Sequence, residues 1–177
     1  MTKDKIFIAE QTLKILENTS WSKLNIDQIA KSKKKLYIKN KNELLTNINR
    51  YFDYLLRKNI KEIENSSSKD MVFEIIMQRL DILNLHRKAI KRTIDHLSSN
   101  PHLFLKLLPS FIESIILIAS LANIKINGVS GAARIKSILI LYFLIIYTWN
   151  KDQTSSLEKT MTTLDNYLTN LNKIIKL

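Results

Sequence analysis

The side chains best suited to chemistry in the first third of the chain are lysines, which crowd the stretch IAKSKKKLYIKNKNELL at residues 29–45. Lysine carries a compact positive charge that holds phosphate oxygens without reading base sequence. Near an anionic lipid surface each lysine contributes about 1 kcal/mol of attraction. We therefore expect phosphate or headgroup contacts from six lysines, with a solvated loop as the alternative: Lys31, Lys33, Lys34, Lys35, Lys39 and Lys41.

The histidines predict neither catalysis nor a metal site. His86 and His96 lie ten residues apart, whereas two ligands on one helix face need a spacing of about four, and His102 is isolated. The sequence has no cysteine, no His-Glu-x-x-His pair, no nucleophile elbow and no glycine-rich phosphate loop. We expect a noncatalytic protein that needs no cofactor or metal.

Composition predicts an all-α fold. The chain has 177 residues, 45% of them hydrophobic, which is enough for a substantial core. Its only glycines are Gly128 and Gly131, so the first 127 residues lack the residue that tight hairpins favour. The absence of cysteine fits a reducing compartment. We expect a cytoplasmic protein, with peripheral attachment to the inner membrane as an option.

The charge is unevenly distributed along the chain. The net charge is +12, and residues 1–110 carry 21 Lys/Arg against 12 Asp/Glu, whereas residues 111–177 carry 7 against 4. A basic front half favours phosphate backbones or anionic lipids as partners. The alternative is a lysine-rich composition without functional meaning.

Hydrophobic spacing of three and four residues predicts a succession of helices. Asn25 and the pair Ser67 and Asp70 resemble helix starts, as does the pair Ser155 and Glu158. We expect a kink or a break at Pro109. We also expect a buried core helix rather than a membrane span at Ile138–Trp149, whose twelve apolar residues fall short of the ~20 needed. The expected helices cover about 3–18, a short stretch behind Asn25 that includes Ile26, Ile29 and Ala30, about 41–64, a stretch opened by Ser67 that buries residues from Val72 to Leu83, and about 86–98, 101 onwards, 130–149 and 155–175.

The front of the chain resembles the DNA-binding end of the TetR family of bacterial regulators. The resemblance rests on a first helix followed by these residues in order: Trp21, Leu24, Ile29, Ala30, Leu36, Tyr37, Lys41, Leu44 and Leu45. It implies an all-α, TetR-like fold with a three-helix head at 1–45, resembling a helix-turn-helix, and a ligand-binding and dimerisation bundle at 46–177.

One departure from that family concerns the recognition helix. Only residues 31–35 separate Ala30 from Leu36, about four fewer than the family usually has. A helix rises 1.5 Å per residue, so little more than about one turn remains to enter the major groove. We expect impaired sequence-specific DNA recognition.

The rear of the chain resembles a second family. The spacing Y-x6-W-x2-D-x-T-x9-L-D, formed by Tyr142, Trp149, Asp152, Thr154, Leu164 and Asp165, is similar to the tail of the ninth Coq protein family, which assists ubiquinone biosynthesis. That family has a TetR-like fold and holds an isoprenoid lipid in an apolar helical cavity. Some TetR-like regulators share the same tail, and the Gly-Asp pair of the lipid-binding family is replaced by ANIKING at 122–128.

Two apolar stretches could line such a cavity, with Tyr142 or Trp149 as the polar group; a fully packed core is the alternative. The candidate lining is Leu107, Phe111, Ile115, Ile118, Leu139, Tyr142, Phe143, Ile146 and Trp149.

The last helix carries a narrow apolar seam, suited either to a homodimer or to packing within the chain: Leu157, Met161, Leu164, Leu168 and Leu171.

Three functions follow from these patterns. The first is a noncatalytic lipid-binding accessory protein that presents an isoprenoid or other small hydrophobic ligand at a membrane surface. The second is a TetR-type DNA-binding regulator with a ligand pocket and a dimer bundle. The third is a helical interaction module that binds neither.

Overall fold

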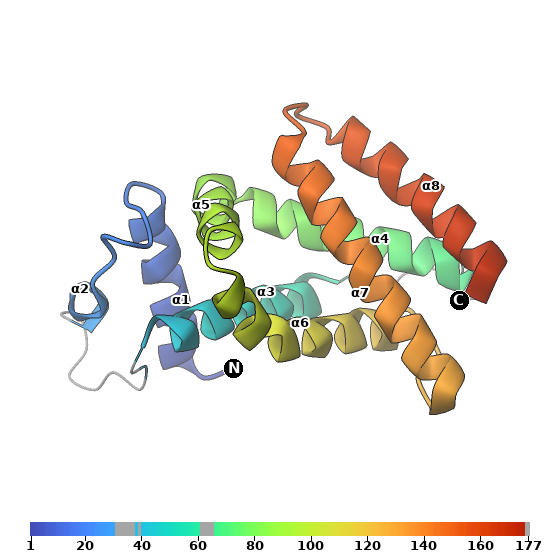
Figure 1. The fold of residues 1–177 in the computed structure, drawn as a ribbon, viewed down its shortest axis with the longest axis horizontal. Helices are drawn as coiled ribbons and strands as arrows, with labels where there is room; N and C mark the ends of the chain where they lie inside the picture. Colours follow the sequence, from blue (N-terminus) through green and yellow to red (C-terminus); the bar gives the residue numbers. More distant parts are fainter. Residues whose placement is uncertain (31–37, 39, 61–65, 176–177) are drawn as a thin grey trace. The chain divides into compact units, whose positions relative to one another are not determined.

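The computed structural model describes residues 1–30, 38, 40–60 and 66–175, apart from the side chains of Gln28 and Ala30, and these residues form helices joined by loops, with no strand among them (Figure 1). The prediction of an all-α protein is confirmed. The helices are α1 (Lys3–Leu16), α2 (Ile26–Ala30), α3 (Lys41–Asn59), α4 (Ser68–Asn84), α5 (Arg87–Ser98), α6 (Pro101–Leu121), α7 (Gly128–Lys151) and α8 (Glu158–Ile175).

The first of two compact units comprises residues 1–58 and 82–111. It contains α1, α2, nearly all of α3, and α5, which packs against α1. Its core is formed by the apolar faces of these short helices, with Leu13, Leu44 and Leu56 fully buried. Because α5 and the first half of α6 belong to this unit, it extends well beyond the head at 1–45 that the sequence predicts.

The second unit comprises residues 59–81 and 112–177, and it contains most of α4, the second half of α6, α7 and α8. Helices α7 and α8 run side by side as a hairpin (Figure 1). Buried Ile75, Ile115 and Ile138 come from three different helices of this unit. The division into a head at 1–45 and a ligand-binding and dimerisation bundle at 46–177 stays a prediction.

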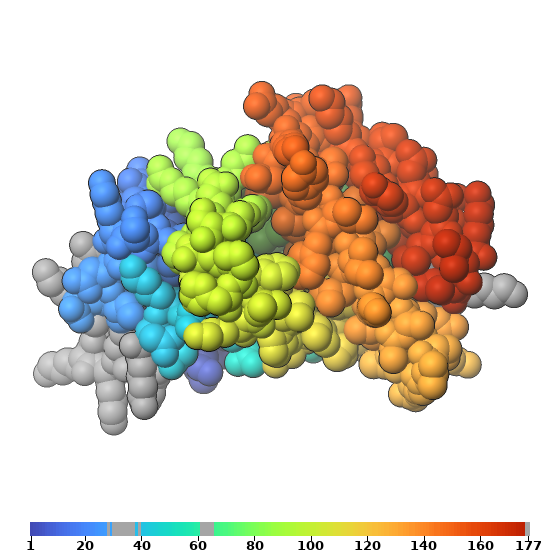
Figure 2. Space-filling view, viewed as in Figure 1, coloured from blue at the N-terminus to red at the C-terminus, as the bar shows by residue number. Residues whose placement is uncertain are grey.

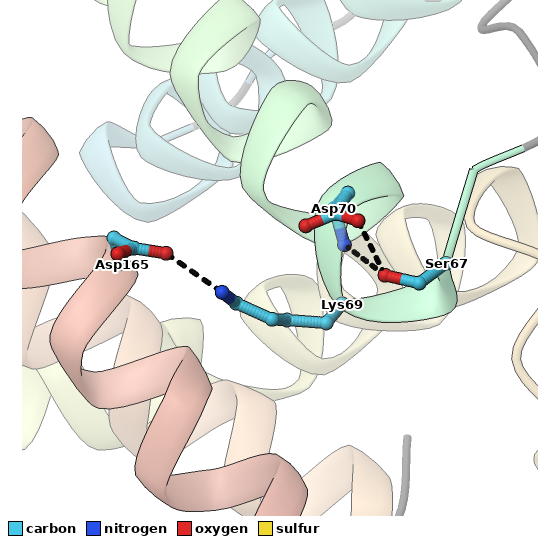
Figure 3. Close-up of polar contacts among 4 residues, drawn as sticks. All are labelled: Ser67, Lys69, Asp70 and Asp165. Carbon is cyan, nitrogen blue, oxygen red and sulfur yellow. Dashed lines mark hydrogen bonds and ion pairs between the residues drawn. The ribbon is translucent and has the colours of Figure 1, made fainter.

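Side-chain caps explain where several helices begin. At the start of α4, the backbone N–H of Asp70 donates to Ser67 Oγ over 3.2 Å, and the Ser67 hydroxyl donates to the Asp70 carboxylate over 2.6 Å (Figure 3). This pairing confirms the predicted start. Asn25 accepts from the N–H of Asp27 before α2, also as expected. Each cap satisfies a backbone donor that has no partner within its own helix.

Several expectations about the helices differ from the structure. Helix α3 ends at Asn59 and not near residue 64. Of the kink or break expected at Pro109, the break does not occur, since α6 continues through Pro109 to Leu121. The last helix begins at Glu158 and not at Ser155, because the hydroxyl of Thr154 accepts the N–H of Glu158 and Leu157 has a left-handed φ of 55°. Residues 155–157 therefore belong to the turn before α8.

Helices α6 and α7 are each long and apolar enough to cross a membrane by length and composition, a criterion that the core helix of a soluble protein also meets. Each has one buried side: Ile115, Ile118 and Ala119 on α6, and Ile138, Tyr142 and Trp149 on α7, are no more than 3% exposed. One face of each of these apolar helices therefore belongs to the core.

Candidate functional site

Of the six lysines predicted to contact phosphate or headgroups, the structure describes one. The Lys41 ammonium, at the first residue of α3, donates to the backbone oxygens of Trp21 over 2.6 Å and of Ser22 over 3.4 Å. This lysine therefore ties α3 to the loop between α1 and α2. The other five, Lys31, Lys33, Lys34, Lys35 and Lys39, lie outside the described residues.

That loop is held by the buried side chain of Trp21. The indole Nε1 donates to the hydroxyl of Thr93 on α5 over 3.0 Å, and the ring stacks on His96 at 5.5 Å between centroids. Burial lowers the pKa of His96, and the positive charge of Lys41 and the neighbouring His102 lower it further. The loop between α1 and α2 therefore packs on α5 through the pair of Trp21 and His96. The surroundings of His96 favour its neutral form.

The two units differ sharply in charge. The first unit, of 88 residues, carries 18 Lys/Arg and 7 Asp/Glu, a net charge of +11. The second unit, of 89 residues, carries 10 against 9, a net charge of +1. A lysine-rich composition without functional meaning would charge both units alike. The concentration of charge in one unit instead favours an anionic partner for that unit.

The second unit buries one guanidinium. Arg79 of α4 is 1% exposed, and its Nε donates to the hydroxyl of Tyr142 on α7 over 2.8 Å. A second nitrogen lies 3.4 Å from the hydroxyl of Ser114 on α6, and the guanidinium also lies over the Tyr142 ring, 5.6 Å from its centroid. A positive charge and two hydroxyls, contributed by three different helices, therefore meet inside the second unit.

Sequence reasoning missed Arg79, although its position carried a signal. It lies four residues after Ile75 and three after Ile76, so it shares a helix face with two core residues. A charged residue on the core face of a helix is expensive to bury and is held by hydrogen bonds. Tyr142, predicted as the polar group of a cavity, is such a partner.

The candidate lining residues are divided between the units. Leu107 and Phe111 belong to the first unit, and the rest to the second. The lining residues in the second unit fall into two groups by their exposure. The buried members are Ile115, Ile118, Tyr142 and Trp149; the half-buried members are Leu139, Phe143 and Ile146.

The tail motif builds the turn between α7 and α8. The buried carboxylate of Asp152 accepts four hydrogen bonds, from the backbone N–H and the hydroxyl of both Thr154 and Thr160, over 2.6–3.0 Å. Burial alone would raise the pKa of Asp152, but these four donors hold it well below its usual range. The ionised carboxylate of Asp152, which follows α7, therefore holds the start of α8 through Thr160.

Other members of the motif also have structural positions. Trp149 and Leu164 are fully buried, and Asp165 pairs with Lys69 of α4 over 2.8 Å (Figure 3). The spacing that resembles the lipid-binding family is thus accounted for by the helix hairpin itself. It supports an architecture and does not by itself identify a ligand.

The predicted dimer seam lies mostly inside its own chain. Leu157, Leu164 and Leu168 are buried, and α8 packs along α7. Leu171 is half-buried, and Met161 is 39% exposed. The sequence left two alternatives open for the seam, a homodimer or packing within the chain. The three buried leucines pack within the chain.

Comparison with known proteins adds no relative: the chain matches no protein-family model, and no curated protein matches it.

Proposed function

We propose that the protein is a noncatalytic, TetR-like lipid-binding accessory protein that works at an anionic membrane surface. In this proposal the second unit holds an apolar lipid and the first unit is drawn to anionic headgroups. The observation that carries it is the Arg79 and Tyr142 pair, because a buried cation and a phenol among apolar core side chains suit a ligand with one polar end. The resemblance of the tail favours an isoprenoid.

The test is mass spectrometry of organic extracts from the purified chain and two variants. Arg79→Met keeps the length and apolar stem of the side chain and removes the charge. Lys173→Met, an exposed position on α8, is the matched control. A lipid present in the wild type and in Lys173→Met, and absent from Arg79→Met, supports the proposal.

An extract free of lipid from every chain would overturn it. So would a lipid that survives Arg79→Met unchanged, because the guanidinium would then have no part in holding it. Circular dichroism of each variant is compared with the wild type, because removing a buried hydrogen-bonded charge can lower stability. The lipid content is compared only between chains that are folded.

A second candidate is favoured by the charge of the first unit: a TetR-type DNA-binding regulator with a small hydrophobic ligand and a dimer bundle. A net charge of +11 over 88 residues would serve DNA phosphates as well as lipid headgroups.

Fluorescence anisotropy with labelled duplex DNA separates the two. Under the lipid proposal DNA binding is unspecific and weakens by about 10³ or more between 50 and 200 mM salt if six or more phosphates are contacted. A regulator keeps binding one sequence in the presence of excess competitor DNA, and that result would move it to first place.

A further inference from the structure

One face of α7 remains uncovered along the whole helix. Its positions recur at steps of four and three residues, which keeps them in one line. We call it the outer face of α7: Val129, Ala133, Lys136, Ile140, Leu144, Tyr147 and Lys151. Figure 2 shows α7, in orange, open at the surface over much of its length.

The centre of the outer face is apolar and accessible. Ile140 is 53% exposed, Leu144 42% and Tyr147 61%, whereas Trp149 on the opposite side is fully buried. Only 28% of the most apolar 18-residue window of α7 is buried. A helix that is apolar on all sides normally has all sides covered. This exposure favours a partner that covers the face.

Charge at the two ends indicates what covers it. Lys136 and Lys151 bracket the apolar centre, 15 residues or about 22 Å apart, and α7 contains no Asp or Glu. The Lys151 ammonium lies over the Tyr147 ring, 4.0 Å from its centroid, and bonds to its hydroxyl. Lysines and tyrosines of this kind place their apolar parts in lipid and their polar ends at the headgroups.

A second copy of the chain fits the same face less well. A two-fold pairing of α7 with α7, centred on Ile140, Leu144 and Tyr147, places Lys136 of one helix opposite Lys151 of the other. Neither helix offers a carboxylate to either lysine. An anionic lipid surface, in contrast, supplies negative charge at both ends and hydrocarbon between them.

We propose that the outer face of α7 docks on an anionic lipid surface. This rests on the proposed function, for which it supplies the membrane-binding face, and it uses none of the residues assigned to the internal ligand. Docking is peripheral: the apolar centre enters the headgroup boundary while the opposite face of α7 stays packed in its unit.

The test is flotation of the full chain with vesicles of 70% phosphatidylcholine and 30% phosphatidylglycerol. Ile140→Gln with Leu144→Gln removes the apolar centre, and we expect partitioning to fall at least tenfold. The control is Met161→Gln with Ile174→Gln, which replaces two exposed apolar residues of α8 in the same unit and should bind as the wild type does. Lys136→Gln with Lys151→Gln should reduce the preference for phosphatidylglycerol over vesicles of phosphatidylcholine alone by about tenfold, at about 1 kcal/mol for each lysine.

Equal partitioning of the wild type and the α7 variant, or no partitioning of the wild type, would overturn the proposal. Sedimentation velocity at the same concentrations tests the rival occupant. A wild-type dimer that the α7 variant converts to a monomer, with vesicle binding unchanged, would assign the face to a second copy. Lipid extracted from the α7 variant keeps the two proposals distinct, because the internal ligand should persist when docking is lost.

Discussion

The two units are almost equal in length but differ in where they carry charge. The first unit has a net charge of +11. Its N-terminal helices are joined to each other and to α5 by two contacts: Trp21 donates a hydrogen bond to Thr93, and Lys41 donates to backbone oxygens. The second unit has a net charge of +1, yet it buries the charged groups Arg79 and Asp152. Surface charge on a unit attracts anionic partners, whereas buried charge fixes one arrangement of helices and offers polarity to a ligand.

The largest expected effect comes from removing the lysines on which this contrast depends. Replacing Lys31, Lys33, Lys34, Lys35 and Lys39 by Gln should weaken binding to anionic vesicles by about 10³-fold, at about 1 kcal/mol for each lysine near the surface. Vesicle flotation at constant salt measures this. The matched variant replaces five lysines of the second unit, Lys61, Lys125, Lys159, Lys173 and Lys176, and should bind almost normally. An equal loss in both variants would mean that the attraction to headgroups does not depend on these lysines of the first unit.

A smaller effect is expected in the stability of the second unit. Asp152→Ala removes the acceptor of four hydrogen bonds and should lower the free energy of unfolding by about 2–4 kcal/mol. Asp165→Ala is the control, because it removes only the exposed pair with Lys69 and should change stability little. Urea titration followed by circular dichroism gives both values. If the two variants lose the same free energy of unfolding, the hydrogen bonds of Asp152 do not stabilise the α7–α8 hairpin as proposed.

The smallest effects are in the dependence of stability on pH, and they differ between the units. The pKa of His96 is lowered, so its contribution is present above the unfolded value of about 6.5 and is lost as pH falls from there through the folded value. The pKa of Asp152 is also lowered, so its contribution is present above about pH 3.9 and is lost below it. The first unit should therefore weaken at a higher pH than the second.

Fluorine NMR of the chain labelled with 5-fluorotryptophan can follow the units separately, because Trp21 lies in the first and Trp149 in the second. As pH falls, the Trp21 signal should broaden or shift first. His96→Phe keeps an aromatic partner for Trp21 and should remove that early change. An early change that persists in this variant would assign it to another group.

Sequence patterns predicted the elements better than their junctions. Periodic apolar residues and local caps such as Ser67 with Asp70 act within a few residues, so the helices and several of their starts followed from the chain alone. The break expected at Pro109 did not form, although proline removes one backbone donor from α6. The role of Asp152 depends on Thr160, eight residues further on and beyond a left-handed Leu157, which no local rule indicates.

The candidate site was predicted in part. Tyr142 was singled out as a polar group on an apolar helix, but its partner Arg79 lies 63 residues away on α4. A contact at that separation depends on how helices assemble, which composition and periodicity do not specify. The exposure of Ile140 and Leu144 was equally hidden, since one face of a helix that is apolar throughout looks like the other in the sequence.

The most direct test of the division between the units is a pair of titrations of the same fluorotryptophan-labelled chain. Farnesol, a short isoprenoid alcohol, is the probe for the second unit, and inorganic tripolyphosphate is the probe for the first. We predict that farnesol shifts the Trp149 signal and leaves Trp21 in place, and that tripolyphosphate does the reverse. A Trp149 signal that ignores farnesol, or a Trp21 signal that ignores tripolyphosphate, would contradict the assignment of lipid to one unit and anions to the other.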